Sequence, residues 1–340
     1  MTDQSTEHPA KQPAPSEEND PAPSSAEIQE TSATPSLSEH GLIEVPEDHR
    51  SGYVTIIGKP NVGKSTLLNA LVGKKLSIVT HKPQTTRHRI LGIMSGDNYQ
   101  VIFLDTPGII KPRYQLQQAM MKNVSRAIAE ADLLLFMADA STRKVDTFSL
   151  EQIQHVNDRP ALLVLNKIDL IPQEEALPLV EEYLKLRTFD DVIPISALKG
   201  FNLEVLKQEI IKRLPYGPPF YPKDMLSEHP ERFFISEIIR EKIFEHFHEE
   251  VPYSTQVNIV QYEERPGQKD FIDAEIIVER PTQKGILIGK GGEALKRVGI
   301  RARKEIEAFL GKPVYLQLHV KVREGWRNKD TYLRSYGYQP

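Results

Sequence analysis

The segment GKPNVGKS, residues 58–65, constrains the fold more than any other part of the chain. It follows a β-branched run at residues 54–57 and precedes an amphipathic stretch at residues 66–72, so it is expected at a turn from strand to helix. Glycines in such a turn let backbone amides converge on phosphate oxygens at the helix N-terminus. The competing interpretation is an ordinary glycine-rich turn, which this context disfavours. We therefore predict a phosphate-binding loop whose nucleotide contacts come from Gly58, Asn61, Val62, Gly63, Lys64, Ser65 and Thr66.

Apolar strand-like runs alternate with helical patterns over residues 50–216, which predicts an α/β domain with a mostly parallel sheet and helices on both faces. The tight turn SGDN at residues 95–98 joins the second run to the third, so these two strands are expected to pair antiparallel. A helix at residues 203–214 closes the domain. The six expected strands are residues 54–57, 90–94, 101–104, 133–137, 161–165 and 192–195.

Two further segments complete the expected nucleotide site. In DTPG, residues 105–108, Asp105 is placed to hold magnesium through water and the Gly108 amide to meet the terminal phosphate. In NKID, residues 166–169, the Asp169 carboxylate can accept hydrogen bonds from the ring N–H and the amino group of guanine. Adenine has no matching donors, and an unpaired buried acceptor costs about 1–3 kcal/mol, so guanine is favoured. The predicted base contacts are Asn166, Lys167, Asp169, Ser196, Ala197 and Leu198.

The polar loop at residues 80–89 contains neighbouring threonines that could complete the magnesium shell and sense the terminal phosphate. We expect Thr86 in this role, with Thr85 as the alternative; the competing interpretation is that both are plain loop residues. The predicted metal ligands are therefore Ser65, Thr86 and Asp105. Hydrolysis is expected to depend on Lys64, Thr86 and Gly108, with Lys64 reaching the outer phosphates.

A Pro-rich linker at residues 217–231 precedes a second pattern at residues 232–324, predicted as helix, strand, strand, short helix, helix and strand. Within it, GKGG at residues 289–292 fits the GxxG loop of a KH domain, an α+β fold of type II, which clamps about four nucleotides of single-stranded RNA. Cationic helix faces are usually just solvated, but this one carries mainly one sign of charge. The predicted RNA contacts are Gly289, Lys290, Gly291, Gly292, Lys296, Arg297 and Arg301.

Composition limits the remaining possibilities. The chain has 340 residues, a net charge of −4 and no cysteine, which excludes disulfides and thiolate metal sites and suits a reducing compartment. No apolar run of about 18 residues could span a bilayer, so a cytoplasmic location is expected, with peripheral attachment to the membrane as a weaker option. Residues 1–49 are acidic and rich in Pro and Ser, and are predicted to be a disordered tail. Residues 325–340 are predicted to be a C-terminal tail, in which Trp326 and the tyrosines either stack on bases or pack in a core.

Taken together, GKPNVGKST, PQTTRHR, DTPGI, NKID, SALKG and FISEIIREK (residues 234–242) resemble the Era GTPases of bacteria, over roughly residues 52–327. The resemblance implies Mg²⁺-dependent hydrolysis of GTP, binding to the 3′ region of 16S ribosomal RNA, a role in assembly of the 30S subunit, and a monomer. Asn61 is similar to an asparagine that binds K⁺ in some relatives. Ile109 stands where other GTPases carry a glutamine that orients water. Era-like proteins share this hydrophobic substitution. The competing hypothesis is an RNA-binding adaptor whose nucleotide site is regulatory, with little turnover.

Overall fold

The computed structural model describes residues 46–339, so most of the predicted acidic tail lies outside the described residues. The last residue of that predicted tail, His49, is buried. Its Nδ1 lies 2.7 Å from the carbonyl oxygen of Gly217, and the Ser51 hydroxyl donates to the carbonyl of Pro218. The start of the Pro-rich linker therefore packs against the first strand.

Six strands form the first sheet in the order β2-β3-β1-β4-β5-β6. β2 and β3 pair antiparallel, and the other neighbours pair parallel, which confirms the arrangement predicted from the SGDN turn. The predicted runs lie within the observed strands, except that β6 ends one residue earlier, at Pro194. The strands are β1 (Arg50–Ile57), β2 (Ile90–Ser95), β3 (Tyr99–Asp105), β4 (Leu133–Asp139), β5 (Ala161–Asn166) and β6 (Asp191–Pro194).

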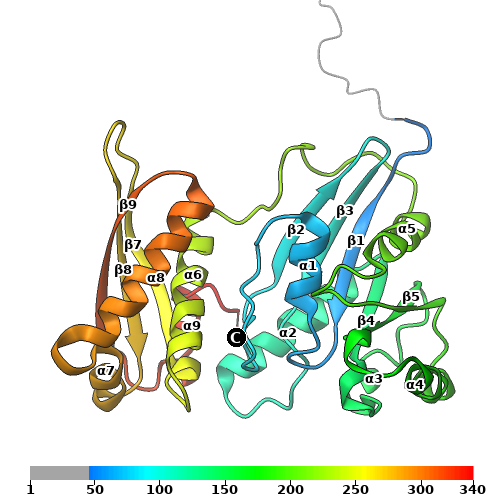
Figure 1. Ribbon diagram of the computed structural model, residues 1–340, viewed down its shortest axis with the longest axis horizontal. Coiled ribbons are helices and arrows are strands. Elements are labelled where there is room, and N and C mark those ends of the chain that lie inside the picture. Colours follow the sequence, from blue (N-terminus) through cyan, green and yellow to red (C-terminus); the bar gives the residue numbers. More distant parts are fainter. Residues whose placement is uncertain (1–45, 340) are drawn as a thin grey trace, which may run out of the picture. The chain divides into compact units, whose positions relative to one another are not determined.

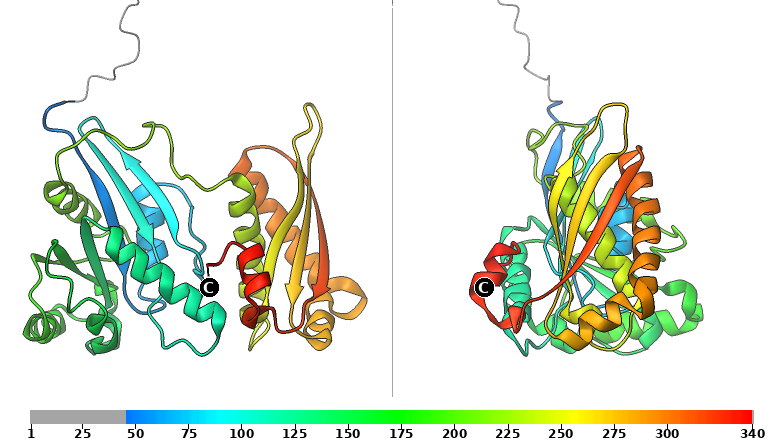
Figure 2. Two further views of the ribbon diagram at one scale, coloured as in Figure 1. Left: turned by 180° about the vertical axis from the view of Figure 1, so that it is seen from behind. Right: turned by 90° about the vertical axis from the view of Figure 1, so that its left-hand side faces the viewer.

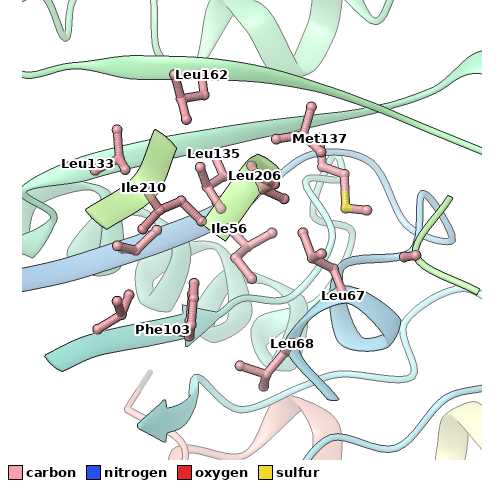
Figure 3. Close-up of a cluster of buried hydrophobic side chains, with 14 of the residues drawn as sticks. Ile56, Leu67, Leu68, Phe103, Leu133, Leu135, Met137, Leu162, Leu206 and Ile210 are labelled. Atoms are coloured by element: carbon pink, nitrogen blue, oxygen red, sulfur yellow. The ribbon is translucent and has the colours of Figure 1, made fainter. Parts of the chain in front are cut away.

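Helices cover both faces of this sheet. On one face α1 (Lys64–Val72) and α5 (Leu203–Arg213) pack against the strands, as the side chains of Leu67, Leu206 and Phe103 show in Figure 3. The other face is covered by α2 (Gln115–Glu130), α3 (Thr147–Glu151) and α4 (Gln173–Leu186). Burying one such aliphatic or aromatic side chain contributes about 1.5–3 kcal/mol, so the two cores hold the carboxyl ends of the strands rigidly beneath the loops that follow them.

A second sheet has the order β7-β8-β9, with β7 antiparallel and β9 parallel to β8. α6 and α8 lie side by side on one of its faces (Figure 1). The element order matches the predicted type II KH fold. The helix that the sequence predicts at residues 293–310 and the strand that it predicts at residues 314–322 are α8 and β9, with the same bounds. The elements are α6 (Glu231–His246), β7 (Gln256–Glu263), β8 (Asp270–Val278), α7 (Pro281–Ile288), α8 (Glu293–Leu310) and β9 (Val314–Val322).

The segment predicted as a C-terminal tail, residues 325–340, is helical and packed within its described part. The short 3-10 helix Trp326–Asn328 and the helix α9 (Asp330–Ser335) are packed, and α9 lies beside α2 in Figure 2. Trp326 is fully buried and its Nε1 donates to the carbonyl of Ser254 at 2.9 Å. Trp326 shares a hydrophobic cluster with Leu116 and Met120 of α2, so its role is packing and not base stacking. No helix within residues 46–339 combines the length and apolar character needed to span a bilayer.

Candidate nucleotide-binding site

The phosphate loop connects β1 to α1, and two of its glycines are required by close contacts. Gly58 and Gly63 have φ of 146° and 105°. A Cβ on Gly58 would lie 2.2 Å from the carbonyl oxygen of Met137, and one on Gly63 would lie 2.3 Å from Nδ2 of Asn166. Gly63 also caps α1 without any side-chain hydrogen bond. The first amides of α1 are therefore available to an anion, which is the arrangement that binds phosphate.

Lys64 points back over this loop. Its Nζ donates to the carbonyl oxygens of Gly58 at 3.1 Å and Lys59 at 2.8 Å. Burial lowers the pKa of Lys64 to about 8, although the negative charges of Asp105 and Asp146 act in the opposite direction. A buried ammonium with a lowered pKa is stabilised by any anion that enters the site. Lys64 is therefore placed to bind phosphate strongly.

Three oxygen-bearing side chains meet beside Lys64. The Ser65 hydroxyl donates to Oδ2 of Asp105 at 2.7 Å and lies 2.9 Å from Oγ1 of Thr86. The Ser77 hydroxyl, which sequence reasoning missed, also donates to Oδ2 of Asp105, at 2.8 Å. Thr85 instead pairs with Thr80 at 2.6 Å, so the geometry favours Thr86 over Thr85.

This set of oxygens suits a hydrated magnesium ion. Burial raises the pKa of Asp105, which is fully buried, and its Oδ1 makes no hydrogen bond within the described part of the chain. A buried, unpaired carboxylate oxygen calls for a partner such as an ion or water. Magnesium typically takes one or two protein oxygens plus phosphates and waters, so it needs no larger cage. Accordingly, residues 46–339 contain no cluster of three or more acidic, His or Cys side chains that could hold a metal.

The base end of the site is held together by Asn166. Its Nδ2 donates to the carbonyl of Val62 at 2.7 Å, and its Oδ1 accepts from the amide of Ala197 at 2.9 Å. Lys167 has φ of 64° and its Nζ donates to Oδ2 of Asp139 at 2.5 Å. Asp169 is exposed and accepts no hydrogen bond from any residue between 46 and 339. A carboxylate held open in this way can receive the paired donors of guanine.

A cavity of about 480 Å³ joins the phosphate end to the base end. The predicted residues Gly58, Val62, Ala197 and Asp105 do not line it. Sequence reasoning missed other lining residues, among them Val79 and Leu170, whose exposed apolar side chains are recognisable only in the structure. The predicted residues that line the cavity are Asn61, Gly63, Lys64, Ser65, Thr66, Thr86, Gly108, Asn166, Lys167, Asp169, Ser196 and Leu198.

The loop that carries Thr86 is also bound to the second domain. The Arg87 guanidinium is buried and donates to the carbonyls of Thr255 at 2.7 Å, Tyr253 at 3.0 Å and Pro252 at 3.1 Å. From α6, Arg240 donates to the carbonyl of Thr85 at 2.6 Å. These buried charges gave no signal in the sequence, because their partners are carbonyls more than 150 positions away along the chain.

The predicted RNA-binding loop lies between α7 and α8. Gly289, Gly291 and Gly292 have φ of 73°, 60° and 83°, and a Cβ on Gly291 or Gly292 would meet open space. These positions therefore leave room for a closely approaching backbone. Beside them a groove of about 370 Å³ runs between α8 and β9. Its lining is mixed basic and apolar: Gly292, Leu295, Lys296, Gly299, Ile300, Arg303, Leu316 and Leu318.

Not every predicted RNA contact lies at this groove. Gly292 and Lys296 line it, whereas Gly289, Lys290, Gly291, Arg297 and Arg301 do not. Arg297 and Arg301 lie on the side of α8 near His246, whose pKa is lowered by burial and then by these two charges. The sequence places Arg303 on the cationic face of this helix but not among the predicted RNA contacts, and sequence reasoning missed Ile300; they follow Gly299 and Lys296 at helical spacing. α8 therefore carries cations on two sides: Lys296 and Arg303 line the groove, and Arg297 and Arg301 lie toward His246.

The phosphate loop, the hydroxyl and carboxylate set, and the open base-reading carboxylate define a P-loop guanine-nucleotide-binding protein with an attached KH domain. Family models described as "50S ribosome-binding GTPase" and "KH domain" match residues 53–167 and 250–327. "GTPase ERA1, chloroplastic" of Zea mays is 53% identical over 295 residues, covering 86% of this chain and 71% of that protein. The chain belongs to the Era family of GTPases, and it is a GTP-hydrolysing enzyme.

Solved structures agree with this assignment. A crystal structure of an Era variant from Aquifex aeolicus bound to GDP·AlF₄⁻ has a TM-score of 0.82 and 44% sequence identity, covering 86% of this chain and 100% of that one. Era in complex with MgGDPNP and nucleotides 1506–1542 of 16S ribosomal RNA has the same TM-score, identity and coverage. "GTPase ERA-like, chloroplastic" of Arabidopsis thaliana is 51% identical, covering 85% of this chain and 69% of that protein.

Proposed function

We propose that this protein is a GTP-hydrolysing switch that binds the 3′ region of 16S ribosomal RNA through its KH domain and acts in assembly and maturation of the 30S subunit. One observation carries this proposal. Within three consecutive residues, Thr86 faces the metal-binding oxygens while Arg87 and the carbonyl of Thr85 bind the second domain. A change at the terminal phosphate therefore reaches the KH domain directly.

The nucleotide site works by positioning and by charge. Lys64 offsets the charge that develops on the outer phosphates, and the Gly108 amide donates to the terminal phosphate. Ser65 and Thr86 would hold Mg²⁺ directly and Asp105 through water. Bound there with the nucleotide, Mg²⁺ would neutralise negative charge on the outer phosphates. Asp169 accepts the two donors of guanine, so GTP and GDP are preferred over adenine nucleotides.

RNA binding rests on the KH loop and its groove. The glycines that leave open space, the cations Lys296 and Arg303, and the apolar floor of Leu316 and Leu318 suit a single strand whose bases are unstacked. The Era complex with nucleotides 1506–1542 of 16S ribosomal RNA supports the 3′ region as the target. A monomeric state, a cytoplasmic location and peripheral membrane association stay predictions.

Potassium is proposed as a second cation. Asn61 has φ of 65°, and its Nδ2 donates to the carbonyl of His81 at 2.8 Å, so the phosphate loop and the following switch loop meet at this point. A monovalent cation there would add positive charge beside the transferring phosphoryl group. We expect hydrolysis to be at least several-fold faster in potassium than in sodium at equal ionic strength. Equal rates in the two salts would argue against the site.

The alternative, an RNA-binding adaptor with little turnover, is favoured only by Ile109, which cannot orient water. Lys64→Ala separates the two functions. The switch predicts that this variant loses hydrolysis and that precursor 16S ribosomal RNA accumulates when it replaces the normal protein in cells. The adaptor predicts normal maturation. Lys144→Ala is the matched control, because Lys144 is exposed and does not line the nucleotide cavity.

A further inference from the structure

The Era-type site needs a group that orients the attacking water, and Ile109 does not supply it. Ile109 is buried, packs in the core with Val124 and Ile128, and its amide donates to the carbonyl of Gly58 at 3.0 Å. Several of the other polar side chains that line this cavity are already engaged. Lys64, Ser65 and Thr86 have the roles described above, whereas Asn61 is held by the His81 carbonyl and Thr80 and Thr85 bond to each other.

Gln84 lies at the boundary of this region. It lines the nucleotide cavity together with Lys64, Thr86 and Gly108. It also lines a second cavity of about 650 Å³, which contains Ile109 and Tyr114. Gln84 therefore lies between the two cavities, at the end of the nucleotide cavity where the terminal phosphate is expected.

A relay of hydrogen bonds fixes the orientation of the Gln84 amide. The backbone amide of Arg113 donates to Oε1 of Gln117 at 2.8 Å, so Nε2 of Gln117 must be the donor to its next partner. That donor bonds to Oε1 of Gln84 at 2.9 Å, and the Tyr114 hydroxyl approaches the same oxygen at 3.4 Å. The NH₂ group of Gln84 is therefore on the side away from Gln117 and Tyr114, and it donates no hydrogen bond to residues 46–339.

The backbone of Gln84 supports a special role. Its φ is 60°, in the left-handed region that non-glycine residues seldom adopt. Such a conformation costs on the order of 1–3 kcal/mol and persists where the surroundings impose it, which is common at functional sites. In this conformation the side chain of Gln84 meets α2, where Gln117 donates a hydrogen bond to it.

We infer that Gln84 is a catalytic side chain that stabilises the transferring phosphoryl group while water attacks GTP, so that the missing glutamine at position 109 is compensated at the phosphate. Its NH₂ group donates to the oxygen of the transferring phosphoryl group that is nearest the entering water. The water oxygen forms the new bond to phosphorus, the bond to the GDP oxygen breaks with its electron pair leaving on GDP, and a water proton passes to the phosphate product. Because the relay begins at the Arg113 backbone, the amide is aligned only when the loop after Gly108 is in place.

Three variants of the full-length protein test this inference. Gln84→Glu keeps an oxygen that accepts from Gln117 but removes the NH₂ donor, and Gln84→Met removes both. Gln117→Leu removes the relay but leaves the donor. Each is measured for single-turnover GTP hydrolysis, for the affinity of a fluorescent GTP analogue, and for binding of aluminium fluoride with GDP. Circular dichroism establishes that each variant is folded.

We expect Gln84→Glu and Gln84→Met to slow hydrolysis about 100-fold, the usual effect of removing one transition-state donor, and to lose aluminium fluoride binding. Their affinity for the GTP analogue should stay within about threefold of the unsubstituted protein. Gln117→Leu should slow hydrolysis by no more than about tenfold. The inference is overturned if Gln84→Met hydrolyses GTP at nearly the normal rate. It is also overturned if Gln84→Met and Gln117→Leu lose rate and GTP affinity equally, because Gln84 would then only brace the loop.

Discussion

His88 shows how one residue can make stability depend on pH. Its ring stacks on Tyr338 with centroids 4.3 Å apart and meets the edge of Phe233 at 5.5 Å. Burial lowers the pKa of His88 to about 4; Glu237 opposes this shift, while Arg240, His229 and Arg87 add to it. The folded state therefore keeps His88 neutral under conditions where the unfolded chain protonates it.

The direction in which the free energy of unfolding changes with pH follows from that difference in the pKa of His88. Above pH 6.5 neither state protonates His88, and between pH 6.5 and pH 4 only the unfolded state does, so stability falls as the pH falls. From pH 7.5 to pH 5 we expect His88 to remove about 2 kcal/mol from the free energy of unfolding. Urea denaturation of the unsubstituted protein and of His88→Phe at both pH values measures this difference. An equal loss in the two proteins would show that other groups cause the pH dependence.

Among the elements, the loop at residues 80–89 is held against the second domain by Arg87. Its guanidinium satisfies three carbonyls of the segment before β7, and it is 2% exposed. Arg87→Ala leaves those buried acceptors unpaired, so we expect the free energy of unfolding to fall by about 3 kcal/mol. The RNA affinity of the GTP-bound and GDP-bound states should also become alike.

Arg89→Ala is the matched control for that prediction. Arg89 lies two residues further along the same loop, and among residues 46–339 its side chain pairs with Glu130 alone; both side chains are partly exposed. Pairs of this kind contribute at most about 1 kcal/mol. If Arg87→Ala is no more destabilising than Arg89→Ala, the loop is not held by its buried guanidinium.

The elements also show what the sequence can and cannot predict. α8 and β9 were predictable to the residue, because α8 carries a regular apolar stripe and ends at Gly311, whose φ of 71° stops the helix. The nucleotide motifs were predictable because each lies at the end of a strand. The sequence favours Thr86 over Thr85 without excluding the alternative, because the choice depends on which hydroxyl faces Ser65. The charged residues Glu237 and Arg240 of α6 are buried, whereas charged residues on a helix usually face solvent. The sequence therefore gave no indication that this side of α6 contacts the loop that carries Thr85.

At the scale of the whole molecule, the sequence left open whether the aromatic residues of the C-terminal segment stack on bases or pack in a core. Residues 325–340 are polar and short, and nothing local marks Trp326, Leu333 or Tyr338 as core residues. They are buried because Leu116 and Met120 of α2, about 200 residues earlier, face them. Such long-range packing is not encoded in local periodicity. The helix that follows DTPG is thus covered by the end of the chain.

The three residues 85–87 contact different parts of the protein in immediate succession, with a carbonyl toward α6, a hydroxyl toward Ser65 and a guanidinium toward the segment before β7. Consecutive Cα atoms lie only about 3.8 Å apart. No hinge or spacer separates the part that detects the nucleotide from the parts that report it. The length of this loop therefore matters as much as its composition. A chain with one more residue here would keep every contact-forming side chain, but the three contacts could no longer form at the same time.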